Sequence, residues 1–557
     1  MKLPSSGLQW SLYLWALFIS TTLAFIPIPR LSGKQTPLKS GEPSPKQVAV
    51  IGAGAAGAST AYSLRKYADA HGIPVNITVF ERESYVGGRS TTVNVFDDPA
   101  YPIELGASIF VQVNYNLVNA SKEFGLNIQG ASYERPRESP DTIGVWDGKS
   151  FVFKMEDSAS WWNIGKILWR YGLAPIRTQN LMKSVVNKFL QLYEEPLFPF
   201  QSLTAAAASV GLLDATSTTG TTFLNKNSVS QDFSREVIQA STRVNYGQNL
   251  PLIHGLESMV CMATDGAMAI EGGNWQIFAG MLKAAQADVR LNHTVSSITR
   301  SKGNSVTLEV KDQLTSKQAK VDFDEVVIAG PYQYSGLTIS PEPEHVPDTI
   351  PFHTLHVTLF SSPHRLSWKY FNLSWPDDIP PETILTTLPD GTNLGDTEDG
   401  VGPAGFWSIS TLRTVNIPSE SGSEPEQHYV YKIFSPEAPT APFIRDILGL
   451  KHPPNESKFR ENGIAALSKR DISWFHEKTW NPYPFLYPRV TFEDPLLAPG
   501  VWYTGGIESF ISTMETSALM GKNVAALVTQ GWLDENEDGE IKGLEDEPVV
   551  DFGDERA

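Results

Sequence analysis

Cysteine is almost absent from this chain of 557 residues, because Cys261 is the single example. One cysteine cannot form an intrachain disulfide, so a packed core has to supply the stability of the fold. The length and the apolar content of 41% allow a large core in about two or three domains. Cys261 itself has two interpretations, a buried structural thiol or a covalent link to a bound cofactor.

Basic residues are also scarce, since 44 Lys and Arg stand against 62 Asp and Glu and the formal net charge is −18. Nucleic-acid binding requires a basic face, so this balance argues against a nucleic-acid partner. Half of the excess lies near the C-terminus, where eleven acids and two bases follow residue 533. We therefore expect an acidic tail at residues 531–557 and a mildly acidic body.

Long hydrophobic runs are limited to residues 8–25, which follow Lys2 and end in the small-residue segment 22–24. This is the layout of a secretory signal peptide at residues 1–24. An uncleaved signal anchor is the alternative, although serines and threonines interrupt the run. The sequence thus predicts a mature chain without a membrane span, located in the secretory pathway, either in a lysosome or vacuole or outside the cell.

Asparagine sequons are consistent with that compartment. A fifth sequon, at Asn76, lies in a predicted strand, and we expect it to be inaccessible. The four candidate glycosylation sites are Asn119, Asn292, Asn372 and Asn455.

Common catalytic signatures are missing as well. The ten histidines do not form an HExxH motif, and the chain contains no Gly-x-Ser-x-Gly or Cys-x-x-Cys segment. The sequence therefore predicts no metal centre built on histidine, and the chemistry has to come mainly from a bound cofactor.

A dinucleotide-binding signature is present near the N-terminus. The apolar segment 48–51 leads into a glycine-rich turn at 52–57, and a helical pattern follows at 58–67. The first glycine permits the turn, the second lets backbone N–H groups approach a pyrophosphate, and the third lets the helix pack on the strand. A predicted strand at 75–80 ends at Glu81, whose carboxylate can accept hydrogen bonds from ribose hydroxyls. The loop residues predicted to hold the cofactor are Gly52, Gly54, Ala55, Ala56 and Gly57.

A second glycine element, Gly-Gly-Arg-Ser, follows the acid, and Glu-Leu-Gly-Ala stands behind it at 104–107. Together they resemble the amine oxidase and prenylcysteine oxidase branch of FAD enzymes, which favours FAD over NAD. The residues that this resemblance assigns to FAD are Gly87, Gly88, Arg89, Ser90, Gly106 and Ala107.

Two later segments narrow the resemblance to the prenylcysteine oxidase family. They are Trp-Arg-Tyr-Gly at 169–172 and Arg-Val-Asn-Tyr-Gly-Gln at 243–248, which ends an amphipathic helix at a turn around Gly247. Four polar side chains of the second segment either contact substrate or form a buried network that supports the fold. They are Arg243, Asn245, Tyr246 and Gln248.

The resemblance also extends toward the C-terminus. Val295 corresponds to a residue that lies against the adenine in flavoproteins with two dinucleotide-binding domains. Gly505 ends a strand and a glycine turn, and a helix at 513–528 begins with Met514 and Glu515. The positive N-terminus of this helix can face the flavin pyrimidine ring.

The fold class expected from these segments is α/β. An FAD-binding Rossmann-like domain of the amine-oxidase type is assembled from discontinuous segments, and an α+β substrate domain accompanies it. A helical stretch rich in aromatics at 157–195 is expected to be mostly core, with a minority of side chains lining an apolar channel. The segment 204–222 is a predicted loop or loosely packed helix. The expected boundaries are 46–130, 261–336 and 489–530 for the FAD domain, 131–260 for a helical substrate part and 337–488 for a mostly β substrate part.

The resemblance covers about residues 47–527 and implies FAD-dependent oxidation of the thioether of farnesyl- or geranylgeranylcysteine, during breakdown of prenylated proteins. Hydride leaves the carbon next to sulfur, water captures the cation, and the products are cysteine, a prenyl aldehyde and, with dioxygen, hydrogen peroxide. Weak candidates for contacts with water or the substrate head group are His254, Glu508 and Tyr246. Two alternatives stay open: a flavin oxidase acting on an amine or thioether secondary metabolite, and a non-catalytic secreted isoprenoid-binding flavoprotein.

One motif lies outside the family pattern. Residues 534–545 match a twelve-residue EF-hand calcium loop, but Pro548 and a short acidic end offer no second helix. A solvated acidic tail is the alternative interpretation. The ligands of the calcium hypothesis are Asp534, Asn536, Asp538, Glu540 and Glu545.

Overall fold

The computed structural model describes most of the chain from residue 44 to residue 545, with its side chains to residue 535. The signal peptide predicted at 1–24 and the sequon at Asn455 lie outside the described residues. None of the helices within this part is long and apolar enough to cross a bilayer. The described ranges are 44–130, 142–156, 167–301, 305–374, 379–392, 395, 397–398, 400–417, 425–452 and 463–545.

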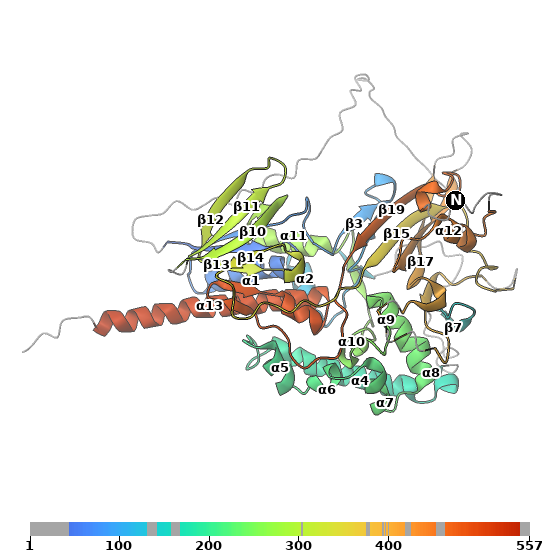
Figure 1. Ribbon diagram of the computed structural model, residues 1–557, viewed down its shortest axis with the longest axis horizontal. Helices are drawn as coiled ribbons and strands as arrows, with labels where there is room; N and C mark the ends of the chain where they lie inside the picture. Colours follow the sequence, from blue (N-terminus) through green and yellow to red (C-terminus); the bar gives the residue numbers. More distant parts are fainter. Residues whose placement is uncertain are drawn as a thin grey trace, which may run out of the picture.

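Distant stretches of the chain build one six-stranded sheet (Figure 1). Its neighbours pair in parallel, except for the edge strand β20. Val48, Ala49 and Val50 of the central strand are fully buried, as expected for a parallel sheet covered on both faces. The strand order is β20 (Leu496–Ala498), β21 (Val501–Tyr503), β13 (Glu325–Ile328), β1 (Lys46–Ile51), β2 (Val75–Phe80) and β9 (Asp288–Arg290).

Helix α1 (Ala55–Ala70) follows β1 and packs closely on helix α13 (Met514–Glu545). A Cβ at Gly521 would lie 2.2 Å from the Ala56 carbonyl oxygen, so this glycine lets the two helices approach. The predicted strand at 75–80 is correct to the residue, and the predicted helix at 58–67 lies within α1. Two further helices pack here, α11 (Trp275–Ala284) against α1 and α2 (Tyr115–Glu123) against α11 and α13.

A four-stranded sheet lies beside this domain (Figure 1). Its order is β12 (Gln318–Phe323), β11 (Val306–Asp312), β10 (His293–Arg300) and β14 (Thr338–Ser340). Two short strand pairs are also present: β3 (Thr92–Asn94) with β4 (Pro102–Glu104) within the first segment, and β5 (Ile128–Gly130) with β8 (Met268–Ile270), which joins the first segment to the second.

A seven-stranded sheet forms the β part of the substrate domain. The structure corrects the sequence prediction here, because residues 142–156 are two strands of this sheet and not part of a helical region. Strand β6 pairs in parallel with β16, and Val145 and Trp146 are buried. That pairing partner lies far along the chain, so local periodicity could not reveal it. The order is β19 (Trp474–Trp480), β15 (Leu355–Ser362), β18 (Glu426–Ser435), β17 (Ser408–Ile417), β16 (Thr383–Thr386), β6 (Thr142–Trp146) and β7 (Phe151–Glu156).

Short helices form a separate layer at one side of the molecule (Figure 1). The segment 204–222, predicted as a loop or loosely packed helix, contains three helices, and Ser202 and Thr219 cap two of them. Helix α9 ends at Gly247, whose φ of 62° is left-handed, as the predicted turn requires. The helices are α4 (Ala174–Leu190), α5 (Leu203–Ser209), α6 (Leu213–Thr216), α7 (Gly220–Lys226), α8 (Gln231–Phe233), a π-helix (Ser234–Ile238), α9 (Gln239–Tyr246) and α10 (Gly255–Val260), with α12 (Ala441–Leu448) beside the sheet.

Candidate functional site

A cavity of about 960 Å³ lies where the six-stranded sheet, the seven-stranded sheet and the helical layer meet. This volume is at the upper end of the range usual for small-molecule sites. Its wall contains most of the residues that the sequence assigns to FAD. They are Gly52, Gly54, Ala55, Ala56, Glu81, Gly87, Gly88, Arg89, Ser90, Gly106, Ala107, Val295, Met514 and Glu515.

The glycine loop after β1 is shaped by close backbone approaches. Gly52 has a φ of 114°, and a Cβ there would lie 2.8 Å from the Ala329 carbonyl oxygen. Gly57 does not line the cavity, but a Cβ on it would lie 1.9 Å from the Gly52 carbonyl oxygen. Gly57 therefore sets the contact between α1 and the loop, while the loop itself faces the cavity.

The N-terminus of α1 is suited to an anion. Gly54 occupies the N-cap position without a side-chain hydrogen bond, and the first turn contains no acidic residue. The backbone N–H groups at a helix start carry a partial positive charge and attract phosphate groups. Gly88 lies against Gly54, so two glycines form the surface at this point.

Glu81 ends strand β2 and is buried. Its Oε2 accepts a hydrogen bond from the Ala53 amide at 2.8 Å, and its Oε1 accepts one from the Glu83 amide at 2.8 Å. Burial raises the pKa of Glu81, while the two amides act in the opposite direction. Because each oxygen can accept a second hydrogen bond, the fixed carboxylate could still receive ribose hydroxyls from the cavity.

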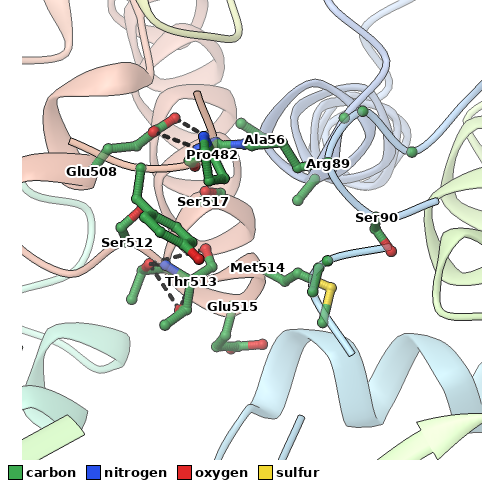
Figure 2. Close-up of a pocket in the computed structure, with 18 of the residues that line it drawn as sticks. Ala56, Arg89, Ser90, Pro482, Glu508, Ser512, Thr513, Met514, Glu515 and Ser517 are labelled. Carbon is green, nitrogen blue, oxygen red and sulfur yellow. Dashed lines mark hydrogen bonds and ion pairs between the residues drawn. The ribbon is translucent and has the colours of Figure 1, made fainter. Parts of the chain in front are cut away.

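Arg89 of the Gly-Gly-Arg element joins the first and last segments of the domain (Figure 2). Its guanidinium donates to both carboxylate oxygens of Glu508, at 2.8 and 2.7 Å, and also to the Pro482 carbonyl oxygen. Glu508 is buried, and such a bidentate pair fixes both side chains. The neighbouring Ser90 hydroxyl is buried and has no hydrogen-bond partner among the described residues.

The C-terminal segment closes the same cavity. Met514 begins helix α13 at the wall, and the next residue, Glu515, lines the cavity as well (Figure 2). The Glu515 carboxylate accepts hydrogen bonds from the Asn116 and Leu117 amides at 2.9 and 3.0 Å, and from the Tyr193 hydroxyl at 2.9 Å. Burial raises its pKa to about 7. Glu515 therefore fastens α13 to the start of α2.

The remaining predicted residues have different positions relative to the cavity. Gly106 packs on Trp480, because a Cβ on it would lie 2.9 Å from the indole ring. Ala107 has a φ of 44°, and its carbonyl oxygen accepts a hydrogen bond from Nδ2 of the Asn274 side chain at 2.9 Å. Val295 is buried at the wall on β10. Gly505 does not line this cavity and starts the 3-10 helix Gly505–Ser509.

Two further walls complete the cavity, and the first contains side chains of the stretch 157–195, a minority of which the sequence predicted to line an apolar channel. This first wall is apolar and comes from α4 and the end of α10, including Val186, Phe189, Leu190, Val260 and Ala263. The other is one face of the seven-stranded sheet, including Ser408, Ser410, Leu412, Lys432 and Phe434.

Lys432 is the residue on this sheet face that sequence reasoning missed. Its Nζ donates to the Glu104 carbonyl oxygen at 2.7 Å and lies 3.5 Å from Ser108 Oγ. Burial lowers its pKa to about 8. The signal was a lysine among the aromatic and aliphatic residues of the segment 429–434, where a strand turns alternate side chains toward the interior.

The residues present fit a flavin dinucleotide. Glycines form a cradle in which side chains would collide, and an uncapped helix faces the cradle. Glu81 is fixed beside the loop by its hydrogen bond from the Ala53 amide, and the buried Ser90 hydroxyl has no hydrogen-bond partner among the described residues. The cavity then continues past this cradle to the apolar and sheet walls.

A family model described as prenylcysteine lyase matches residues 154–540, and one described as an NAD(P)-binding Rossmann-like domain matches residues 50–122. The first match spans more than half of the chain. The chain belongs to the prenylcysteine lyase family.

Curated relatives agree with this membership. Farnesylcysteine lyase of Arabidopsis thaliana is 29% identical over 501 residues, which cover 87% of this chain and 88% of the relative. Prenylcysteine oxidase 1 of Homo sapiens is 28% identical over 509 residues, which cover 88% and 90% of the two chains. The resemblance inferred from the sequence motifs is thus confirmed.

Solved structures show the fold of this family member. Cyclohexylamine oxidase from Brevibacterium oxydans superposes with a TM-score of 0.51 at 17% identity, covering 88% of this chain and all of that one. Putrescine oxidase superposes with a TM-score of 0.51 at 14% identity, covering 87% and 99%. At such identity the likeness concerns the fold alone, and it confirms the predicted fold class.

The three weak catalytic candidates have different positions in this family member. Tyr246 lines the cavity, and its hydroxyl donates to the Ser512 carbonyl oxygen at 3.0 Å. Glu508 lines it too but is held by Arg89. His254 does not line it: its Nδ1 accepts a hydrogen bond from the Glu257 amide at 3.1 Å and caps helix α10. Burial lowers the pKa of His254 to about 3.

The family segment 243–248 divides between the two roles that the sequence left open. Arg243 is fully buried and donates to Thr386, Asn249 and two backbone carbonyl groups, with Trp407 beneath its guanidinium. Gln248 is also buried and hydrogen bonds to the backbone of residues 484 and 486. Asn245 and Tyr246 line the cavity. Arg243 and Gln248 therefore belong to a buried network that supports the fold, whereas Asn245 and Tyr246 can contact a bound molecule.

Two further buried groups, Cys261 and Glu257, lie near Tyr246. Cys261 lines the cavity, and burial raises its pKa well above the ordinary value, so it stays a thiol, the less reactive form. Glu257 is fully buried behind Tyr246, and neither carboxyl oxygen makes a hydrogen bond of regular geometry to a described residue. Burial raises the pKa of Glu257 to about 8, although the Tyr246 hydroxyl and the Ser512 amide act to lower it.

The calcium hypothesis is not supported by the backbone. Helix α13 continues through residues 534–545, whereas an EF-hand ligand set requires a loop. The acidic tail predicted as the alternative is helical as far as residue 545. Elsewhere in the described chain, His345, Asp348 and Glu493 could approach a metal ion, but His345 Nε2 already lies 2.6 Å from Glu493 Oε2, and Glu493 also accepts the Asp348 amide.

The described sequons differ in accessibility. Asn119 is exposed on α2, and Asn292 is half-buried in a turn with a φ of 57°. Asn372 is exposed, although its amide donates to the Lys149 carbonyl oxygen at 2.8 Å. Glycosylation at these three positions remains a prediction.

Proposed function

We propose that the protein is an FAD-dependent oxidase that cleaves the thioether of prenylcysteines, farnesyl- or geranylgeranylcysteine, during breakdown of prenylated proteins. Dioxygen and water are the co-substrates, and the products are cysteine, a prenyl aldehyde that takes its oxygen from the water, and hydrogen peroxide. The enzyme works in the secretory pathway, in a lysosome or vacuole or outside the cell, as the apolar leader segment and the sequons suggest.

The main support for this proposal is that three different surfaces line one cavity. The dinucleotide cradle, the apolar wall of α4 and α10 and the mixed sheet face all line the same continuous space. A prenylcysteine has the matching parts, since an apolar chain and an amino-acid head meet at the sulfur. The relatives named for prenylcysteine and farnesylcysteine are similar to this chain over nearly their whole length, which supports the same substrate class.

FAD, when bound, supplies the hydride acceptor for this oxidation. The chain's own residues would hold it: the uncapped start of α1 would bind its phosphate groups and Glu81 would accept hydrogen bonds from a ribose, while Arg89 with Glu508 fixes the cradle to the last segment. Loss of hydride from the carbon next to sulfur needs no acid or base of the protein, because the sulfur lone pair stabilises the cation that is left on that carbon. Orientation of one C–H bond is therefore the main task of the walls.

The two outer walls divide the substrate between them. Phe189, Leu190 and Val260 offer the prenyl chain an apolar surface, and its burial supplies the larger part of the affinity. On the opposite face, Lys432 presents an ammonium group whose charge suits the carboxylate of the cysteine head. Ser408 and Ser410 lie on the neighbouring strand and can hydrogen bond to the same head group.

The test uses the full chain purified from a eukaryotic secretory host. A yellow protein with a flavin spectrum that bleaches with farnesylcysteine under anaerobic conditions, and forms peroxide when air is admitted, is the expected result. Bleaching by an amine and not by a thioether would assign an amine oxidase instead. A folded protein without flavin would refute the flavoenzyme itself.

The matched substrate control is farnesylcysteine sulfone. It has nearly the same shape, but its sulfur has no lone pair to stabilise a cation on the adjacent carbon. We expect it to compete with farnesylcysteine without bleaching the flavin. Equal bleaching by the sulfone would contradict thioether oxidation while leaving the binding mode intact.

A further inference from the structure

An exposed apolar corner lies at the start of helix α4. A helical turn at residues 167–171 ends at Gly172, whose φ of 59° is left-handed, and α4 starts two residues later. Trp169 before the corner is 91% exposed, and Leu173 and Ile176 after it are 58% and 46% exposed. Contiguous exposed apolar side chains usually mark an interaction surface, whereas single exposed apolar residues do not.

The corner is held firmly from below. Tyr171 is buried, its ring packs on Phe233, and its hydroxyl donates to Glu236 Oε2 at 2.7 Å. Arg170 adds an ion pair to the same carboxylate at 2.7 Å. The outward position of Trp169 is therefore fixed by the packing beneath it.

The charge around the corner is opposite to that of the whole protein. Residues 167–193 contain four basic residues and no acidic one, in a chain with a net charge of −18. Arg177 and Lys183 are exposed on α4, and neither has an acidic partner among the described residues. Nearby acids are present on other elements, namely Asp232 and Glu236, and Arg235 lies within 3.9 Å of both.

We propose that this corner docks on an anionic lipid surface. Exposed Trp and Leu side chains enter the interface of a bilayer, and the flanking Arg177 and Lys183 meet the negative headgroups. The corner is separate from the proposed active site, because Trp169, Leu173 and Ile176 do not line the cavity. A lipid surface fits this corner because an exposed tryptophan and exposed aliphatic side chains lie beside basic residues that have no acidic partner in the described part of the chain. The apolar side chains match the bilayer interface, and the basic residues match anionic headgroups.

Helix α4 also links this surface to the cavity. Its first turn carries Ile176 and Arg177 at the corner, and its last turns carry Val186, Phe189 and Leu190 at the apolar wall. α4 lies in the layer of helices at one side of the molecule in Figure 1. An apolar substrate dissolved in the bilayer would thus meet the protein on the element that forms the apolar wall.

The experiment measures vesicle binding by the full-length FAD-loaded protein without substrate. Vesicles of phosphatidylcholine alone are compared with vesicles that also contain phosphatidylserine, using flotation. Trp169→Ser with Leu173→Ser is expected to weaken binding at least tenfold on both. Arg177→Glu with Lys183→Glu is expected to weaken binding about tenfold or more on anionic vesicles only.

Matched controls come from the exposed turn after β11. Leu314 is 78% exposed there and Lys317 is exposed, so Leu314→Ser and Lys317→Glu change the same residue types elsewhere. We expect both controls to bind like the wild type. Wild-type protein that floats with neither vesicle, or corner variants that bind unchanged, would overturn the proposal. Activity on detergent-dispersed farnesylcysteine tests the proposed function separately, and the corner variants should retain it.

Discussion

Replacing Glu257 by Gln should stabilise the protein increasingly as the pH rises. Burial raises the pKa of this carboxyl group from 4.5 to about 8, so the folded state keeps it protonated while the unfolded state ionises. Stability is therefore lost as pH rises above the unfolded pKa, and the loss levels off above the folded pKa. Between about pH 5 and about pH 7 the wild type should lose about 2.5 kcal/mol more free energy of unfolding than the variant.

Urea unfolding of the FAD-loaded protein at the two pH values measures this difference. The amide has nearly the same size as the acid and sits among the same neighbours, Tyr246 and Ser512, so the comparison isolates the charge. Glu236→Gln is the matched control, because Glu236 is equally buried but is paired with Arg170. The control should lose stability at both pH values. If the extra stability of the Glu257→Gln variant does not grow between the two pH values, the folded protein does not keep the Glu257 carboxyl group protonated, and the reasoning is refuted.

Three further substitutions test the cradle and the sheet wall. Gly57→Ala should abolish retention of FAD, seen as loss of the visible flavin spectrum, because its Cβ would lie 1.9 Å from a backbone oxygen, whereas Gly531→Ala has open space and should keep the cofactor. Lys432→Met should raise KM for farnesylcysteine about tenfold but change KM for its methyl ester much less, since only the free acid offers a carboxylate to the ammonium group. Glu508→Ala should lower the free energy of unfolding by about 1–3 kcal/mol, because it removes both carboxylate oxygens that accept from the partly exposed Arg89 and leaves only the Pro482 carbonyl oxygen, and an unchanged urea midpoint would contradict that role.

The sequence by itself determined the nucleotide half of the protein. The strand at 75–80, the glycine loop and Glu81 lie as predicted because short-range sterics dictate them: a tight turn between a buried strand and a helix tolerates only glycine at set positions. The same local logic located the turn at Gly247. The motifs were also sufficient for the family, because each of them is a short run of consecutive residues that can be read without the fold.

The tertiary structure alone decided which polar residues face the cavity. Arg243 and Tyr246 are three residues apart on one helix, yet the first is enclosed in a buried network and the second reaches the cavity wall. His254 caps a helix instead of lining the cavity, and Lys432 reaches the cavity from a strand in which the sequence assigned no site residue. Sequence periodicity gives the face of an element but not what packs against that face.

Long-range pairing decided the rest of the architecture. Residues 142–156 joined the seven-stranded sheet through a partner strand far along the chain, and the acidic segment 534–545 continued a helix instead of forming a calcium loop. In both places local composition was compatible with more than one backbone, as short segments commonly are. The chain therefore encodes its cofactor loop locally, whereas the substrate walls exist only after distant segments have packed together.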